Sequence, residues 1–180
     1  MKNILSWVTD DRIKETDIEK SLKHYLIEML KIRSDRESKT REKEMAKYLN
    51  EIFQECGWKT EIFEIAYNRC GVIGKLGEGE AKFGVITHID TVSSYFEPYI
   101  KDDVIFGRGV CNTKDIIAAI CLLSSIYEPE NYQLIFIGLP GEESDQIIAE
   151  PTNFTPGKST NSWEDLLLNI NLNNHILLIL

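Results

Sequence analysis

Apolar residues recur at helical spacing in two stretches near the start of the chain. In residues 16–32 they fall every three or four positions, and Thr16 and Glu19 have the spacing of a capping box. Residues 41–57 repeat the pattern, and Gly57 is a suitable C-terminal stop. We therefore predict two amphipathic helices joined by the polar loop "RSDRESKT". The residues predicted to face the core are Ile18, Leu22, Tyr25, Leu26, Met29, Leu30, Met45, Leu49, Ile52, Phe53 and Cys56.

Strand-like segments follow these helices. "WKTEIFEI" and "CGVIGKL" precede a turn at "GEGE", and "FGVITHID" comes after it. The segment "KDIIAAICLLSSIY" is apolar over most of its circumference and predicts a buried helix, and "YQLIFIGL" predicts a buried strand. Helices that alternate with apolar strands indicate an α/β sheet.

The pattern changes near the end of the chain. From Thr155 onward the sequence is rich in asparagine and leucine and has little periodicity, and it follows Pro151 and Pro156. We therefore divide the chain into a partial catalytic domain, residues 1–154, and an atypical tail, residues 155–180, which we expect to be poorly ordered.

Composition and charge narrow the classes of function. The net charge of −9 over 180 residues argues against a nucleic-acid surface, because no basic cluster could replace phosphate counterions. No apolar run has the length of a membrane span or of a signal peptide. The four cysteines form no CxxC pair, which favours reduced thiols in the cytoplasm. A G-x-S-x-G elbow is absent, and the glycines of "GVIGKLGEGE" lack the context of a nucleotide-binding loop.

Two pairs of polar residues stand where predicted strands end. His88 and Asp90 are two positions apart and share one face, and Glu142 and Glu143 follow the next buried strand. Each pair alone is explained as well by a hydrogen-bonded strand end or a solvated loop. Because both pairs fall on the same rim of an open α/β sheet, together they favour a cation site.

Four segments, in this order, resemble a known family. "THIDTV", "FGRGVCNTK", "GEES" and "IIAEPTNF" are similar to the motifs of the dinuclear zinc family of acetylornithine deacetylase, succinyl-diaminopimelate desuccinylase, aminoacylase and carboxypeptidase G. The phrase "DDVIFGRG" most resembles the branch that deacylates carrier-bound lysine or ornithine. The resemblance implies a three-layer fold with a mixed, mostly parallel sheet and helices on both faces, incomplete at the C-terminus.

The resemblance also implies the roles of individual residues. His88, Glu143 and Glu150 would be metal ligands, and Asp90 would orient His88. Glu142 would be the general base that takes a proton from the attacking water. The implied cofactor is one or two zinc ions, with cobalt or manganese as alternatives. The implied substrate is a small N-acyl amino acid or peptide, and a homo-oligomer is compatible with the family. Lys114 and Arg108 match family positions that we interpret as members of structural ion pairs rather than as catalytic groups.

Three departures weaken the expectation of activity. Asn112 stands where the family has its metal-bridging aspartate, and a carboxamide brings one ligating oxygen and no charge. Two divalent ions about 3.5 Å apart repel by on the order of 19 kcal/mol at an effective dielectric of about 20, so the second ion should be lost first. We expect neither Cys111 nor Asp115 to replace the missing carboxylate.

The other two departures concern length. Only "SDQIIA" separates Glu143 from Glu150, too short for a parallel crossover, so Glu150 is expected to lie away from the site. The family's later lid domain and last histidine have no counterpart, and His175 lies in the tail without their context. Two readings follow from these residues: a metal-dependent amidohydrolase, or a truncated and inactive relative that binds a small ligand, one metal or a homologous partner.

Overall fold

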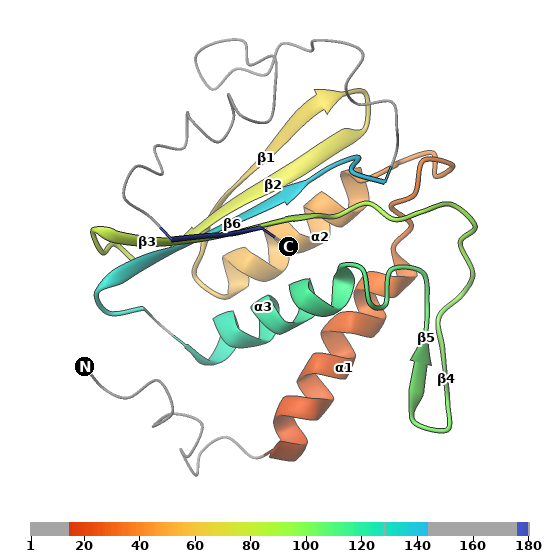
Figure 1. Ribbon diagram of the computed structural model, residues 1–180, viewed down its shortest axis with the longest axis horizontal. Coiled ribbons are helices and arrows are strands. Elements are labelled where there is room, and N and C mark those ends of the chain that lie inside the picture. The colour runs from red at the N-terminus through yellow and green to blue at the C-terminus, as the bar shows by residue number, and fades with distance from the viewer. Residues whose placement is uncertain (1–14, 128, 144–175, 180) are drawn as a thin grey trace.

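A mixed five-stranded sheet and three helices form the body of the molecule (Figure 1). The computed structural model describes residues 15–127, 129–143 and 176–179. The strands of the main sheet lie in the order β1-β2-β6-β3-β7. Their bounds are Lys59–Ala66 for β1, Arg69–Leu76 for β2, Ala81–His88 for β3, Tyr132–Leu139 for β6 and Ile176–Ile179 for β7. The helices are α1 (Glu15–Lys31), α2 (Lys43–Glu55) and α3 (Lys114–Ile126).

The main sheet contains both antiparallel and parallel pairs of strands. β1–β2 and β2–β6 pair antiparallel, whereas β3 pairs parallel with β6 and with β7. The sheet is thus mixed, as predicted, but among the described strands the parallel and antiparallel pairings are equal in number rather than mostly parallel. The physical reason is local, because the short β1–β2 connection closes as a hairpin, while β3 and β6 are joined through α3.

The helices pack on one side of the sheet in the described part of the chain (Figure 1). The predicted helical stripes face this layer, where Met29, Leu30 and Phe53 are fully buried. The Phe53 ring stacks on Trp58 and meets Phe136 edge-on, which joins α2 to the centre of the sheet. On the opposite face Ile86 and Ile137 are also buried, but no described helix covers them. The prediction of helices on both faces is therefore met on one face among the residues described.

A second, two-stranded sheet was missed by the pattern analysis. β4 (Tyr99–Lys101) and β5 (Val104–Phe106) form an antiparallel hairpin whose turn holds Asp102 and Asp103 at positive φ. The strands are short, and all three side chains of β4 are exposed, so no alternation of polar and apolar positions marks them.

The end of the chain also contributes to the sheet. Ile176–Ile179, within the predicted tail, pairs with Phe83–Ile86 of β3 as an edge strand. The remaining tail residues lie outside the described part of the chain. No helix among the described residues combines the length and apolar character that crossing a membrane requires.

Candidate metal centre

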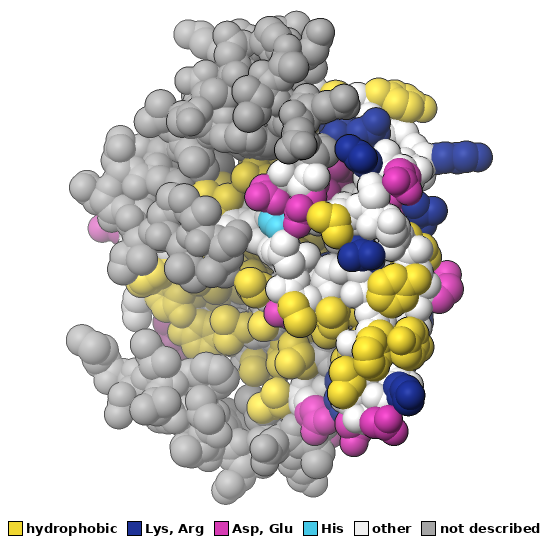
Figure 2. Space-filling view, turned by 45° about the vertical axis from the view of Figure 1, so that its right-hand side comes forward, with side chains coloured by type: hydrophobic (Ala, Val, Ile, Leu, Met, Phe, Trp, Pro, Cys, Tyr) yellow, Lys and Arg dark blue, Asp and Glu magenta, His cyan; other side chains and the backbone are white. Residues whose placement is uncertain are grey.

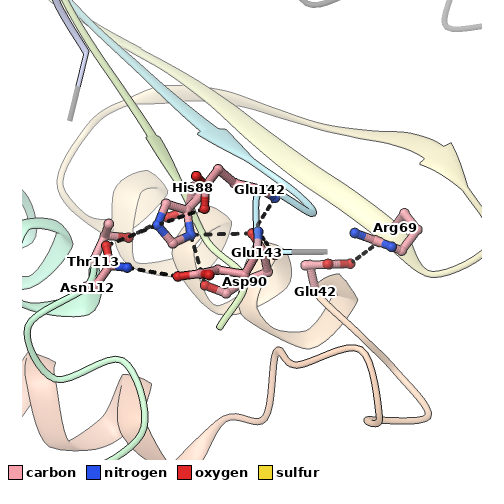
Figure 3. A network of polar contacts seen from close by, with 8 residues as sticks. All are labelled: Glu42, Arg69, His88, Asp90, Asn112, Thr113, Glu142 and Glu143. Carbon is pink, nitrogen blue, oxygen red and sulfur yellow. Dashed lines mark hydrogen bonds and ion pairs between the residues drawn. The ribbon is translucent and has the colours of Figure 1, made fainter. Parts of the chain in front are cut away.

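The parallel pairing of β3 and β6 brings the two predicted polar pairs to one edge of the sheet. His88, the last residue of β3, is the register partner of Leu139, the last residue of β6. Asp90 lies two residues beyond β3, and Glu142 and Glu143 follow β6 after a turn in which Gly141 has a φ of +84°. That φ favours glycine, because a Cβ would crowd the backbone there. Figure 3 shows the four side chains converging at this edge.

A third segment closes the site from the side of α3. The turn before this helix carries Asn112 and Thr113, which are joined by a cis peptide bond. The Thr113 hydroxyl donates to the backbone carbonyl of His88 over 2.6 Å, and Asn112 points at the His88 ring (Figure 3). The glycines of the "FGRG" motif allow the close approach that this requires. A Cβ on Gly107 would lie 2.8 Å from the Leu30 side chain, and one on Gly109 would lie 2.7 Å from that of Thr91.

His88 is buried and hydrogen-bonded through both ring nitrogens. Its Nδ1–H donates to the Asp90 backbone carbonyl over 3.0 Å and lies 3.4 Å from the Asp90 carboxylate. Its Nε2 lies 3.2 Å from Asn112 Oδ1 and 3.8 Å from a carboxylate oxygen of Glu142. Burial by itself lowers the pKa of His88, but the Asp90 carboxylate, the Asn112 oxygen and Glu142 outweigh it and raise the pKa to about 9. Both nitrogens therefore carry protons at neutral pH in this arrangement.

Asp90 connects the two strand ends. Its two carboxylate oxygens accept the backbone N–H groups of Glu142 and Glu143 over 3.0 and 2.9 Å. The side chain is only 3% exposed, so these bonds are made in a largely water-free environment. One carboxylate thus fixes the start of the glutamate loop and faces the imidazole of His88.

Asn112 lies between His88 and Glu143. Its Oδ1 faces the imidazole, and its Nδ2 donates to Glu143 Oε1 over 2.8 Å. In this orientation the amide oxygen accepts from the imidazole N–H and the amide NH₂ donates to the carboxylate, so both contacts pair a donor with an acceptor. The sequence resemblance predicts a metal-sharing carboxylate at this position, and the amide found here can ligate through one atom only.

One cation fits the side chains at this edge. Single ligand atoms of His88, Glu142 and Glu143 all lie within 4.8 Å of one another. Two ligands of one tetrahedral zinc ion are about 3.4 Å apart, so the side chains would have to approach one another by roughly 1.4 Å at most. The Glu142 side chain is 63% exposed and can make that movement by rotation. Imidazole and carboxylate are suitable zinc donors, and the His88–Asp90 contact is the support that a ligating histidine ordinarily has.

Two buried charged groups support the loops behind the site, and their partners are distant in sequence. Lys114 Nζ donates to the backbone carbonyls of Met29 and Ile32, at the C-terminal end of α1, over 2.9 and 2.8 Å. Burial lowers the pKa of Lys114 to about 7, against the opposing charge of Asp35. Lys114 thus has a structural role, as predicted, but its hydrogen bonds go to carbonyls rather than to the acid of the predicted ion pair.

The second buried group is the ion pair between Arg69 and Glu42, which are 2.9 Å apart (Figure 3). Burial raises the pKa of Glu42 to about 7, even though Arg69 acts in the opposite direction. Sequence reasoning missed this pair. The only available signal was an acid at the start of the predicted second helix, which has many surface equivalents.

Five of the six predicted site residues lie in this network: His88, Asp90, Asn112, Glu142 and Glu143. Glu150, and with it the argument about the short "SDQIIA" connection, lies outside the described residues, as does His175. Cys111 is exposed and does not belong to the ligand group found among the described residues. The assignment of ligand and base roles to these side chains remains a prediction.

Comparison with known proteins places this edge in context. No protein-family model matches the chain. The [LysW]-lysine/[LysW]-ornithine hydrolase of Saccharolobus islandicus is 28% identical over 133 residues, which are 74% of this chain and 36% of the relative. A putative hydrolase of the same name from Pyrococcus abyssi is 36% identical over 104 residues, 57% of this chain and 28% of the relative. The chain is a relative of these hydrolases. It spans about a third of their length.

Solved structures show the same fold in peptidases. A tripeptidase from Staphylococcus aureus superposes with a TM-score of 0.59 at 22% identity, over 70% of this chain and 37% of that chain. The dipeptidase Dug1p from Saccharomyces cerevisiae gives 0.63 at 13% identity, over 72% of this chain and 33% of that chain. The predicted mixed α/β fold class and the predicted resemblance to the deacylase group are confirmed, whereas the mostly parallel sheet and the helices on both faces are not seen among the described residues.

Proposed function

We propose that this relative of the [LysW]-lysine/[LysW]-ornithine hydrolases provides the core of a metal-dependent amide hydrolase. The observation that carries the proposal is the convergence of His88, Glu142 and Glu143, whose ligand atoms lie within 4.8 Å of one another at the rim of the sheet. The substrate class that fits is a small amino acid or peptide acylated on nitrogen, with an acylated lysine or ornithine as the first candidate because the relatives are named for that chemistry. Zinc is the proposed metal, and cobalt or manganese could take its place.

The residues of the chain have separable tasks in this reaction. His88 and Glu143 would hold the cation, which would supply positive charge that polarises the scissile carbonyl. Asp90 holds the backbone of both glutamates and faces the imidazole of His88, so it fixes the spacing between the ligands. Glu142 has an exposed carboxylate 3.8 Å from His88 Nε2 and would take the proton from the attacking water and pass it to the leaving amine.

An inactive metal-binding relative is the second candidate, and Asn112 is the observation that favours it. The carboxamide at the bridging position brings no negative charge, so two cations would repel without compensation. Such a chain would still hold one cation through His88 and a glutamate. We infer that one ion is bound and that hydrolysis by this chain alone is slow.

The test combines zinc binding with hydrolysis of N-acetyl-ornithine and N-acetyl-lysine. The wild-type chain, Glu142→Gln and the exposed control Glu80→Gln are compared by calorimetric zinc titration and by release of the free amine. If Glu142 is the base, Glu142→Gln keeps zinc binding and loses hydrolysis by about 100-fold or more. If Glu142 is mainly a ligand, its zinc affinity falls instead. Absence of zinc binding by the wild-type chain would refute the proposed function, and zinc binding without hydrolysis would favour the inactive relative.

A further inference from the structure

The side-chain amide of Asn112 is a neutral group that contacts both a nitrogen and a carboxylate of the candidate metal centre. It accepts from His88 Nε2 over 3.2 Å and donates to Glu143 Oε1 over 2.8 Å. An aspartate at this position would have no proton to give to Glu143. The arrangement therefore depends on the amide chemistry of this side chain and not only on its shape.

We propose that the Asn112 carboxamide bridges His88 and Glu143 by hydrogen bonds in the position of a metal-shared carboxylate, so that the site keeps its geometry without a cation and accepts one cation at most. This inference deepens the proposed function, on which its statement about cations rests. The bridge itself concerns only the chain's own side chains.

The contacts around Asn112 make such a bridge effective. Its neighbour Thr113 is tied to the His88 backbone, and Asn112 N donates to the carbonyl of Gly109 over 3.3 Å, so the backbone on either side is held. Glu143 is held through its own backbone N–H by Asp90. Asn112 therefore joins two segments whose main chains are already fixed, and little conformational freedom is lost when its two hydrogen bonds form.

The bridge also limits the number of cations. A first ion would take Glu143 and the His88 ring, with water beside Glu142 completing its shell, at the expense of the two amide bonds. A second ion would need a shared anionic ligand, and the amide offers one neutral oxygen. Asn112 thus limits the site to one metal ion.

The experiment compares the wild-type chain with Asn112→Asp, Asn112→Ala and the exposed control Asn131→Asp. The melting temperature is measured in excess chelator, and zinc stoichiometry is measured by calorimetry. In chelator both Asn112 variants should melt about 2–5 °C below the control, because an exposed hydrogen-bond bridge is lost. Asn112→Asp keeps an acceptor for His88 Nε2 but sets two carboxylates against each other, whereas Asn112→Ala loses both hydrogen bonds.

Zinc should reverse the loss of stability for the aspartate variant. We expect up to one ion on the wild-type chain and on Asn112→Ala, and a second ion with at least tenfold tighter overall binding on Asn112→Asp. Melting temperatures in chelator equal to that of the control would refute the bridge. Two ions on the wild-type chain, or no gain for Asn112→Asp where the wild-type chain does bind zinc, would refute the limit to one cation. Zinc bound by neither form would refute the proposed function, while the chelator measurement would still decide on the bridge.

Discussion

Asp90→Asn is the substitution that most directly tests how the two strand ends are held together. It preserves the shape of the side chain but removes the charge and one of the two acceptor oxygens. In the structure both oxygens are used, one by Glu142 N–H and the other by Glu143 N–H. The amide can keep one of these bonds, and its NH₂ group must face the remaining backbone N–H, donor against donor.

The size of the effect follows from burial and charge. A hydrogen bond to a charged acceptor contributes about 1.5–3 kcal/mol, and the unsatisfied N–H adds a desolvation cost. Asp90 is 3% exposed, so little solvent screening reduces these values. We expect a loss of about 3 kcal/mol, which corresponds to a melting temperature lower by roughly 6–12 °C in a chain of this size. Because the Asp90 carboxylate raises the pKa of His88, that pKa should also fall.

Scanning calorimetry, NMR titration of the His88 ring protons and zinc titration measure the three consequences. The control is Asp102→Asn at the exposed turn of the β4–β5 hairpin, where the same chemical change occurs and asparagine tolerates the positive φ. Zinc affinity of Asp90→Asn should fall by about 10–100-fold, as for other residues that support a metal ligand. If Asp90→Asn melts within 2 °C of the control, with roughly unchanged zinc affinity and His88 pKa, Asp90 does not hold these segments together.

Two further predictions concern proton competition and the buried ion pair. Zinc affinity should rise about tenfold per pH unit between pH 6 and 8. With a pKa of about 9, His88 must lose a proton before a cation binds. This dependence of zinc affinity on pH should be absent in His88→Gln. Its persistence in that variant would show that another group titrates. Arg69→Met should cost about 3 kcal/mol, because Glu42 would stay buried without this cation, whereas Lys59→Met at the exposed pair with Glu78 should change the melting temperature little. Equal shifts for the two variants would contradict the role given to burial.

Periodicity was sufficient to predict the helices and strands β1, β2, β3 and β6, whereas β7 lies in the tail that we expected to be poorly ordered. The stripes that predict α1 and α2 are the sides buried in the structure, with Met29, Leu30, Met45 and Leu49 all at 0% exposure. The residues of β6 and α3 are so apolar that the sequence predicted both elements to be buried. The β4–β5 hairpin lacked such a signal, because neither of its short strands alternates between buried and exposed positions.

The position of the candidate site was predictable, but much of its support was not. His88 and Glu142 follow apolar strands, and parallel neighbours end at the same edge, so local sequence was enough to bring them together. Lys114 contacts the carbonyls of Met29 and Ile32, more than eighty positions away, and no local pattern identifies those acceptors. The amide bridge of Asn112 depends likewise on where Glu143 falls after the fold is complete. The substitution of asparagine was visible in the sequence, whereas its two partners were not.

The pairing of β7 with β3 has a consequence for the order of folding. β3 joins β6 through the nearby α3, but its other neighbour begins at Ile176, which must be brought back over roughly ninety residues of chain. Contacts between segments so distant in sequence form late and slow the folding of a domain. We therefore expect the crossover unit from Ala81 to Glu143 to form the rim of the candidate metal centre first, with the edge strand joining a surface on which His88 and both glutamates are already in place.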